Sequence, residues 1–413
     1  MPHNALHHKH RPDTPVGVAR RRAGSGTRVP LLALCGVVLG LGACSDNGHA
    51  PTEPTPDQLA EGKHTFRFDT FGDETFWTDT LRMHEVIQTA VSPQTALSVG
   101  LKVDADALPP GTLESADLSD PATTVALLKL NAVVGLKGTV ETVGGKDTLT
   151  HIGITCALCH STVDNRAAPG IGSRLDGWPN LDLDPGAIIA LSPALTPDQK
   201  AVYNSWGPGK YDARFNIDGQ SDPAVIPPAY GLAGVHSVTY TGDGDRPAYW
   251  NRYVAVTQMH GHGSFSEPRL GVAVNNPPDS VEGKLPALEA YQLSLTAPPA
   301  PPASFDPAAA ARGQVLFEGT AQCATCHAGP ELTDANARLH DTLEVPTDPT
   351  HARRSATKMY RTTPLRGLWQ HAPYFHDGSA ATLADVVERY VSAKGLSLTS
   401  GQKADLIEYL MSL

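Results

Sequence analysis

Two short stretches, Cys156-Ala-Leu-Cys159-His160 and Cys323-Ala-Thr-Cys326-His327, decide how this sequence can fold. Each places two cysteines on one helical turn with a histidine directly after them. This spacing is the attachment signature of c-type haem: the two thiols bind the haem vinyl groups and the histidine binds the iron. For one such motif alone, a thioredoxin-like redox pair or half of a zinc site is an alternative.

The cysteine count favours haem. The 413-residue chain has six cysteines, and the two motifs hold four of them. Cys35 lies in a predicted leader and Cys44 at a predicted lipidation site, so no thiol remains for a disulfide. We therefore predict two covalently bound haems c. Each porphyrin would give the chain an apolar plate to pack around.

Composition limits the fold and the function. Charged residues make up 18% of the chain, and it contains 38 Gly and 35 Pro. The charged share is below the usual value of about 25%. We therefore expect a loop-rich protein. The net charge of −11 argues against nucleic-acid binding, which depends on Lys and Arg. No apolar run reaches the length of about 18 residues that marks a membrane-spanning helix.

The N-terminus has the pattern of an export signal. A basic segment precedes an 11-residue apolar run at 31–41, which leads into Leu-Gly-Ala and Cys44. This resembles a bacterial lipobox; an ordinary signal peptide with a chance cysteine is the alternative. We predict a lipoprotein signal at 1–43 and a disordered tether at 44–57. The protein would be anchored by its lipid in a Gram-negative cell envelope, facing the periplasm. Ser45, rather than Asp, favours the outer membrane.

The rest of the chain divides into two predicted haem domains of a mainly α fold, both like cytochrome c. The N-terminal domain covers 58–297, with helices expected at 76–91 and 122–134. A Pro-rich linker at 298–303 leads to a C-terminal domain at 304–413. There Asp306 and Pro307 are suited to the start of a helix, because Asp caps and Pro fits the first turn. A second helix at 400–413 would cross it, as in cytochrome c.

Residues 360–390 (YRTTPLRGLWQHAPYFHDGSAATLADVVERY) resemble the C-terminal domain of bacterial di-haem cytochrome c peroxidases and MauG proteins. The first motif with the following Gly170-Ile-Gly172, and the segment 228–242, are similar to the N-terminal domain of that family. The inserted N-terminal part is also similar to the di-haem rubber oxygenases. The resemblance implies that the N-terminal haem reacts with peroxide or oxygen. The C-terminal haem would relay electrons to it.

The chain departs from the family in three places. Its peroxidases usually carry a histidine soon after the first motif as a displaceable ligand, but the stretch 173–178 (SRLDGW) has none. The N-terminal haem is then either five-coordinate or capped from elsewhere. Tyr240 stands where the family has a bridging tryptophan. No asparagine near Ile226 matches the family's calcium ligand, which makes a bound calcium ion doubtful.

The resemblance also suggests ligands and catalytic groups. Tyr390 lies 14 residues after His376, where MauG-type proteins carry an axial tyrosine, so it is the candidate sixth ligand of the C-terminal haem. Met359 and His371 are the alternatives. The polar segment 258–269 contains His260 and Glu267, our candidates for moving a proton during cleavage of the O–O bond.

Two functions remain open at this stage. The first is a peroxidase-like oxidoreductase that takes electrons from a small redox protein or another one-electron donor and acts on hydrogen peroxide or dioxygen. The second is a non-catalytic electron carrier of the periplasm. The only membrane contact expected in either case is through the lipid.

Overall fold

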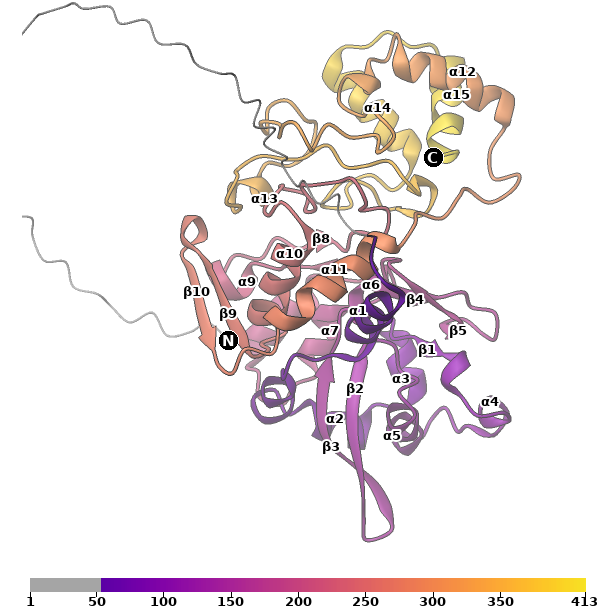
Figure 1. Cartoon of the computed structure of the whole chain (residues 1–413). Coiled ribbons are helices and arrows are strands. Elements are labelled where there is room, and N and C mark those ends of the chain that lie inside the picture. The colour runs from indigo at the N-terminus through magenta and orange to yellow at the C-terminus, as the bar shows by residue number, and fades with distance from the viewer. Residues whose placement is uncertain (1–52) are drawn as a thin grey trace, which may run out of the picture. The chain divides into compact units, whose positions relative to one another are not determined.

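The computed structural model describes residues 53–413, so the predicted signal peptide and Cys44 lie outside the described residues. Helices predominate, and the strands form short pairs (Figure 1). The helices are α1 (Pro56–Phe68), α2 (Met83–Ala90), α3 (Pro93–Ser98), α4 (Thr112–Ser115), α5 (Pro121–Lys129), α6 (Ala157–His160), α7 (Pro185–Ala190), α8 (Pro197–Asn204), α9 (Phe215–Asp218), α10 (Pro247–Tyr253), α11 (Leu285–Ser294), α12 (Pro307–Glu318), α13 (Thr350–Arg353), α14 (Leu383–Lys394) and α15 (Ser400–Met411). No helix within 53–413 is long and apolar enough to cross a membrane.

The strands pair two by two. Their bounds are β1 (Val103–Asp104), β2 (Leu136–Val143), β3 (Lys146–Ile154), β4 (Ser161–Val163), β5 (Ile171–Gly172), β6 (Arg174–Asp176), β7 (Lys210–Tyr211), β8 (Ala224–Val225), β9 (Gly263–Glu267) and β10 (Val272–Asn276). The longest pair is the antiparallel hairpin β2–β3, which ends just before the first cysteine motif. Strand β4 follows that motif directly and pairs with β6 in the antiparallel direction.

Two helix pairs share one packing geometry. Helix α1 packs on α11, and α12 packs on α15. A β-carbon on Gly62 of α1 would overlap the carbonyl oxygen of Ala287, and one on Gly313 of α12 would overlap that of Asp405. In each pair a phenylalanine four residues after the glycine meets a tyrosine of the partner helix edge-on. The glycines therefore allow close helix crossings in both halves of the chain.

The similarity extends into the sequence around these helices. Residues 287–295 (ALEAYQLSL) align with 405–413 (DLIEYLMSL). The last residue of each segment, Leu295 or Leu413, accepts a backbone hydrogen bond of 2.8 Å from Gly231 or Gly367. Both glycines follow a proline by three residues, and their φ angles of 65° and 68° favour glycine. The described part of the chain thus has an N-terminal lobe (residues 56–295) and a C-terminal lobe (residues 307–413) with a common helical frame.

Adding one methyl group at the α12–α15 crossing should destabilise the protein. We expect Gly313→Ala to lower the free energy of unfolding by about 1–3 kcal/mol, the usual cost of overpacking. Gly401→Ala is the matched control, because a β-carbon at Gly401 of α15 would meet nothing within 4 Å. Chemical denaturation of both variants tests this. Equal stabilities would contradict the close crossing.

Buried ion pairs join the two lobes. Arg354, which follows α13, bonds Asp212 at 3.0 Å and Asp218 at 2.8 Å in the N-terminal lobe. The Arg354 side chain is only 4% exposed. The carbonyl of Arg354 accepts a hydrogen bond from Arg214, which in turn pairs with Asp243. Removing one partner of such a pair would leave a buried charge unpaired and would therefore destabilise the contact between the lobes.

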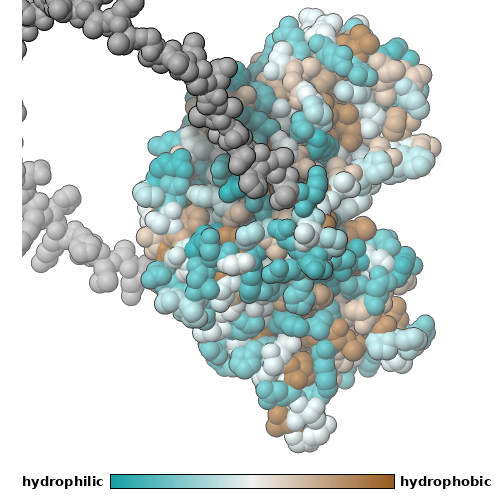
Figure 2. Space-filling model, viewed as in Figure 1, coloured by the Kyte–Doolittle hydropathy of each residue, from teal (hydrophilic) through white to brown (hydrophobic). Residues whose placement is uncertain are grey.

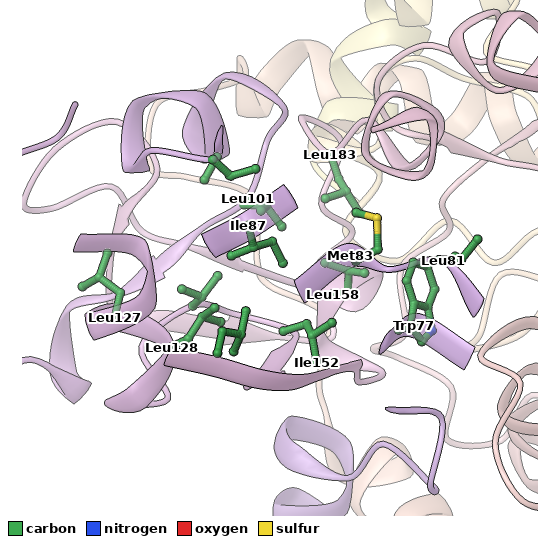
Figure 3. Packing of buried hydrophobic residues seen from close by; sticks show 14 of the residues in the cluster. Trp77, Leu81, Met83, Ile87, Leu101, Leu127, Leu128, Ile152, Leu158 and Leu183 are labelled. Atoms are coloured by element: carbon green, nitrogen blue, oxygen red, sulfur yellow. The ribbon is translucent and has the colours of Figure 1, made fainter. Parts of the chain in front are cut away.

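The hydrophobic core of the N-terminal lobe lies around the first cysteine motif. Leu158, between the two cysteines, packs among Trp77, Met83, Ile152 and Leu183 (Figure 3). A smaller cluster around Phe317 fills the C-terminal lobe. Most of the face seen in Figure 2 is hydrophilic, with hydrophobic residues scattered over it.

Local structure differs from the sequence expectations in several places. The predicted helix at 76–91 is a π-helical turn, Thr75–Thr80, and then α2, because Arg82 has a φ of 55° and interrupts it. The predicted helix at 122–134 corresponds to α5, which ends at Lys129. Helix α1 begins at Pro56, so the last two residues of the predicted tether are helical. Asp306 caps α12 as predicted, by accepting from the amide of Ala308.

Candidate haem sites

The first motif presents a half-buried histidine in a fixed orientation. Nδ1 of His160 lies 3.0 Å from the carbonyl oxygen of Pro227. A carbonyl only accepts, so Nδ1 carries the hydrogen and Nε2 keeps a free lone pair. Burial lowers the pKa of His160 to about 4, which keeps the ring neutral. A neutral imidazole oriented by a backbone carbonyl is what a haem iron requires.

The second motif repeats this arrangement. Nδ1 of His327 lies 3.1 Å from the carbonyl oxygen of Leu332. Burial lowers the pKa of His327 to about 4 as well, and the backbone of Thr363 also faces the ring. Pro227 and Thr363 each directly precede the proline of a Pro-x-x-Gly-Leu segment. The same loop of each lobe thus helps to orient its histidine.

The cysteines have the properties of tethers rather than of a redox pair. Burial raises the pKa of Cys156 and Cys159 to about 12, and that of Cys323 to about 11. None of the four motif cysteines forms a disulfide. A thioredoxin-like pair needs a lowered thiol pKa, so this alternative does not fit. Ligand atoms of Cys326, Asp334 and His340 do lie within 4.8 Å of one another, a set that could hold a metal ion if Cys326 carried no haem.

Tyr390 lies beside the second motif. It is on α14, and its ring stacks on Phe375 with centroids 6.2 Å apart. Burial raises the pKa of Tyr390 to about 12, and the neighbouring Cys323 and Cys326 add to the rise. Tyr390 as the sixth ligand therefore stays a prediction.

The alternative ligands are placed differently. Met359 is 38% exposed. His371 has its Nε2 2.9 Å from the hydroxyl of Tyr230 in the N-terminal lobe. Neither is linked to the second motif by a contact like that of Tyr390.

Arg361 provides a further test of whether haem fits. It is buried in the C-terminal lobe and donates to the carbonyl of Ser237 at 2.5 Å. Its Nε has no hydrogen-bond partner, and burial lowers its pKa to about 10. A buried guanidinium with an unused donor suits a carboxylate such as a haem propionate. The residues present therefore fit a haem in this lobe.

The two predicted proton-transfer residues, His260 and Glu267, have different surroundings. His260 has a φ of 66°, and its ring stacks on Phe76 with centroids 3.7 Å apart. Glu267 on β9 pairs with Arg269 at 2.6 Å and accepts from the Tyr249 hydroxyl at 3.0 Å. The hydrogen bonds from Arg269 lower the pKa of Glu267 to about 2. Glu267 is thus a carboxylate at neutral pH, able to accept a proton but not to deliver one.

Sequence reasoning missed a buried polar group near the first motif. The Tyr211 hydroxyl donates to Gln258 Oε1 at 3.0 Å, and Gln258 Nε2 donates to Asn216 at 3.1 Å. Burial raises the pKa of Tyr211 well above its usual range, with smaller effects of Tyr203 and Cys159. Tyr211 therefore holds its proton close to a haem-attachment cysteine. The one sequence signal for this group was Gln258, which is the first residue of the polar segment 258–269.

A histidine pair at the lobe contact predicts an acid-sensitive structure. His351 stacks on His376 with ring centroids 5.1 Å apart, and its Nδ1 is buried without a partner. Burial lowers the pKa of His351 to about 3, with further effects of His376, Arg214 and Arg354. The unfolded chain binds this proton near pH 6.5 and the folded chain only near pH 3. The free energy of unfolding therefore decreases as the pH falls from about 6.5 to about 3.

We expect His351→Phe to flatten the pH dependence of stability. The slope between about pH 6 and pH 4 should fall by up to about 1.4 kcal/mol per pH unit, the contribution of one proton. Unfolding by denaturant across that range measures it. The exposed His236 provides the control, and His236→Asn should leave the slope unchanged. Parallel curves for the parent and His351→Phe would contradict the assignment.

The sequence comparisons agree with the motifs. A family model described as RoxA-like, cytochrome c-like matches residues 359–391, the segment that contains Tyr390. The methylamine utilization protein MauG of Methylorubrum extorquens is 31% identical over 122 residues, which cover 25% of this chain and 34% of MauG. Part of the chain is thus similar to MauG and to a RoxA-like cytochrome c domain. It matches about a third of the length of MauG, and its cytochrome c-like segment indicates covalently bound haem c.

Solved structures with some likeness are more distant. Hydrazine synthase of Kuenenia stuttgartiensis is 20% identical with a TM-score of 0.31, covering 46% of this chain and 73% of its own. A MauG-like protein associated with microbial copper homeostasis is 20% identical with a TM-score of 0.32, covering 47% and 74%. A variant of the di-haem peroxidase BthA from Burkholderia thailandensis is 13% identical with a TM-score of 0.26, covering 87% and 86%. These likenesses are too distant to assign an activity.

Proposed function

We propose that this relative of MauG is a c-type cytochrome with two haems, which reduces peroxide in its N-terminal lobe with electrons received through its C-terminal lobe. One observation carries the proposal: each lobe holds a half-buried, neutral histidine after a Cys-x-x-Cys pair, with Nδ1–H bonded to a backbone carbonyl. A single site would suffice to carry electrons one at a time. Reduction of hydrogen peroxide needs two electrons, which two haems can hold together.

The residues of the chain would divide the work between the lobes. Cys156 and Cys159 tether one haem, which His160 binds; Cys323 and Cys326 tether the other, which His327 binds. When bound, the first haem supplies an iron at which peroxide is reduced, and the second exchanges single electrons. The Nδ1–H bond to Pro227 makes His160 a more basic ligand, because it increases electron density on the ring.

Side chains of this protein would supply the protons for the reaction. Tyr211 keeps its proton beside Cys159, and Gln258 fixes the direction of its hydroxyl. His260 remains our candidate for acid–base work, because an imidazole ring can both accept and donate a proton. Glu267 would act as a fixed negative charge that orients Tyr249 and Arg269.

Two measurements test the proposal together. Mass spectrometry of the denatured protein should show two covalently attached haems. The holoprotein should oxidise a reduced one-electron donor, such as a small cytochrome, only when hydrogen peroxide is added. A ferric electron-spin-resonance spectrum should contain a high-spin component from an open N-terminal site. Two low-spin irons without peroxide turnover would instead favour the non-catalytic carrier.

We also propose that the protein is exported and anchored by lipid at Cys44, which would bring it to periplasmic electron donors. The evidence is the apolar segment 31–41 followed by Leu-Gly-Ala-Cys. We expect Cys44→Ser to release the protein from the membrane fraction or to leave it uncleaved. Fractionation with and without detergent measures this. A parent protein that fractionates freely without detergent would contradict the anchor.

A further inference from the structure

A tyrosine and a histidine from different lobes meet in the contact between the two lobes. The Tyr230 hydroxyl lies 2.9 Å from Nε2 of His371. Tyr230 is 3% exposed. The two residues are 141 positions apart in the chain, so only the packing of the lobes brings them together.

The hydrogen bond between them has a defined direction. The side-chain amide of Gln370 donates to the Tyr230 oxygen, so that oxygen is already an acceptor. The single phenol hydrogen can then go to His371 at 2.9 Å or to the Gly367 carbonyl at 3.5 Å. The shorter contact is the stronger one. When His371 carries its hydrogen on Nδ1, Tyr230 donates to the lone pair of Nε2.

Burial keeps both partners neutral in the resting protein. It raises the pKa of Tyr230 above its usual range and lowers that of His371 to about 4. A neutral phenol bonded to a neutral imidazole has a proton acceptor already in place. Loss of an electron makes a phenol strongly acidic, so its proton would move along this bond without further rearrangement.

Aromatic rings and short backbone segments surround the pair. Trp178 lies edge-on to Tyr230 with centroids 6.3 Å apart, and to Trp369 at 5.9 Å. Tyr230 is three residues after Pro227, whose carbonyl holds His160. On the other side, His371 follows Thr363, which faces His327, by eight residues. In each lobe, the residue of the pair thus follows closely in sequence the segment whose backbone faces the motif histidine.

We propose that Tyr230 and His371 form a proton-coupled redox pair that passes oxidising equivalents between the lobes. This rests on the proposed function. With the haems bound, Tyr230 would give one electron towards the N-terminal lobe, and its hydroxyl proton would move to Nε2 of His371. One electron received from the C-terminal lobe would then restore the phenol, and the proton would return from His371. Electrons and protons balance within this cycle.

Two experiments on the holoprotein test the pair. In the first, one equivalent of hydrogen peroxide is added and the sample is frozen rapidly for electron-spin resonance. We expect a tyrosyl radical in the parent that is absent in Tyr230→Phe. In His371→Gln, which cannot accept the proton, its formation should be slower by about tenfold. Formation in the parent should also be slower in D₂O than in H₂O.

The second experiment does not use peroxide. A flash-oxidised ruthenium tris-bipyridine complex should generate the same radical in the parent and not in Tyr230→Phe. Tyr374→Phe is the matched control, since Tyr374 is buried in the same loop as His371 and its hydroxyl donates to the Leu368 carbonyl instead of to a histidine. Unchanged haem potentials in Tyr230→Phe would show that the haem sites remain intact.

The outcomes separate the pair from the peroxidase function. A Tyr230 radical after the flash but not after peroxide supports the pair and contradicts peroxide reduction. A radical that persists in Tyr230→Phe, or that forms equally fast in His371→Gln and in D₂O, overturns the pair. Loss of the radical in Tyr374→Phe would overturn it too, since the oxidised residue would then be Tyr374.

Discussion

Replacing His160 by glycine should reduce peroxide turnover by at least about a thousandfold, which corresponds to about 4 kcal/mol of transition-state stabilisation. His160 is the residue of the N-terminal lobe whose Nε2 is left free by a backbone hydrogen bond. Without it, the iron loses its protein ligand while the two thioether tethers remain. Haem content by mass should therefore stay near two, and steady-state oxidation of a reduced donor should fall.

Two comparisons make this result specific. Added imidazole should restore part of the turnover in His160→Gly, because it can enter the space left by the side chain. His151→Asn changes an exposed histidine of the β2–β3 hairpin and should leave turnover unchanged. If His327→Gly lost peroxide reactivity while His160→Gly kept it, the roles of the two lobes would be reversed.

The sequence predicted the parts of the fold that have short-range signals. Both cysteine motifs are local, and so is the start of α12, where Asp306 caps and Pro307 fits the first turn. Helix α1 was missed because its sequence is mostly polar and only Gly62, Thr65 and Phe66 are buried. Its counterpart α12 has the same Gly-x-x-x-Phe spacing. Comparing the two halves of the chain, rather than searching for a fixed period, would have found it.

The candidate sites depend more on long-range contacts. The approach of Tyr211 to Gln258 joins residues 47 positions apart, and no local pattern predicts it. The pairing of Arg354 with Asp212 spans 142 positions and likewise arises only when the lobes pack. Glu267 could be selected from its neighbourhood in the sequence. Its low pKa could not, because that follows from how Arg269 folds back onto it.

Tyr390→Phe should raise the reduction potential of the C-terminal haem by at least about 60 mV, the change for a tenfold shift between ferric and ferrous binding. A phenolate ligand carries negative charge and stabilises ferric iron more than ferrous iron. Burial and the neighbouring thiols raise the pKa of the free Tyr390 hydroxyl to about 12. Only an iron bound directly to the oxygen would therefore remove its proton at neutral pH.

Spectroelectrochemical titration of the parent and the variant measures this shift, and the absorption of the same haem should change with it. Tyr409→Phe is the matched control, because Tyr409 packs on Phe317 in the same lobe with ring centroids 5.1 Å apart. Loss of the Tyr409 hydroxyl should leave the reduction potentials of both haems unchanged. If Tyr390→Phe also left the spectra and potentials unchanged, Tyr390 would be a packing residue of α14. Met359→Ala would then be the next variant to measure, since a thioether ligand would raise the potential rather than lower it.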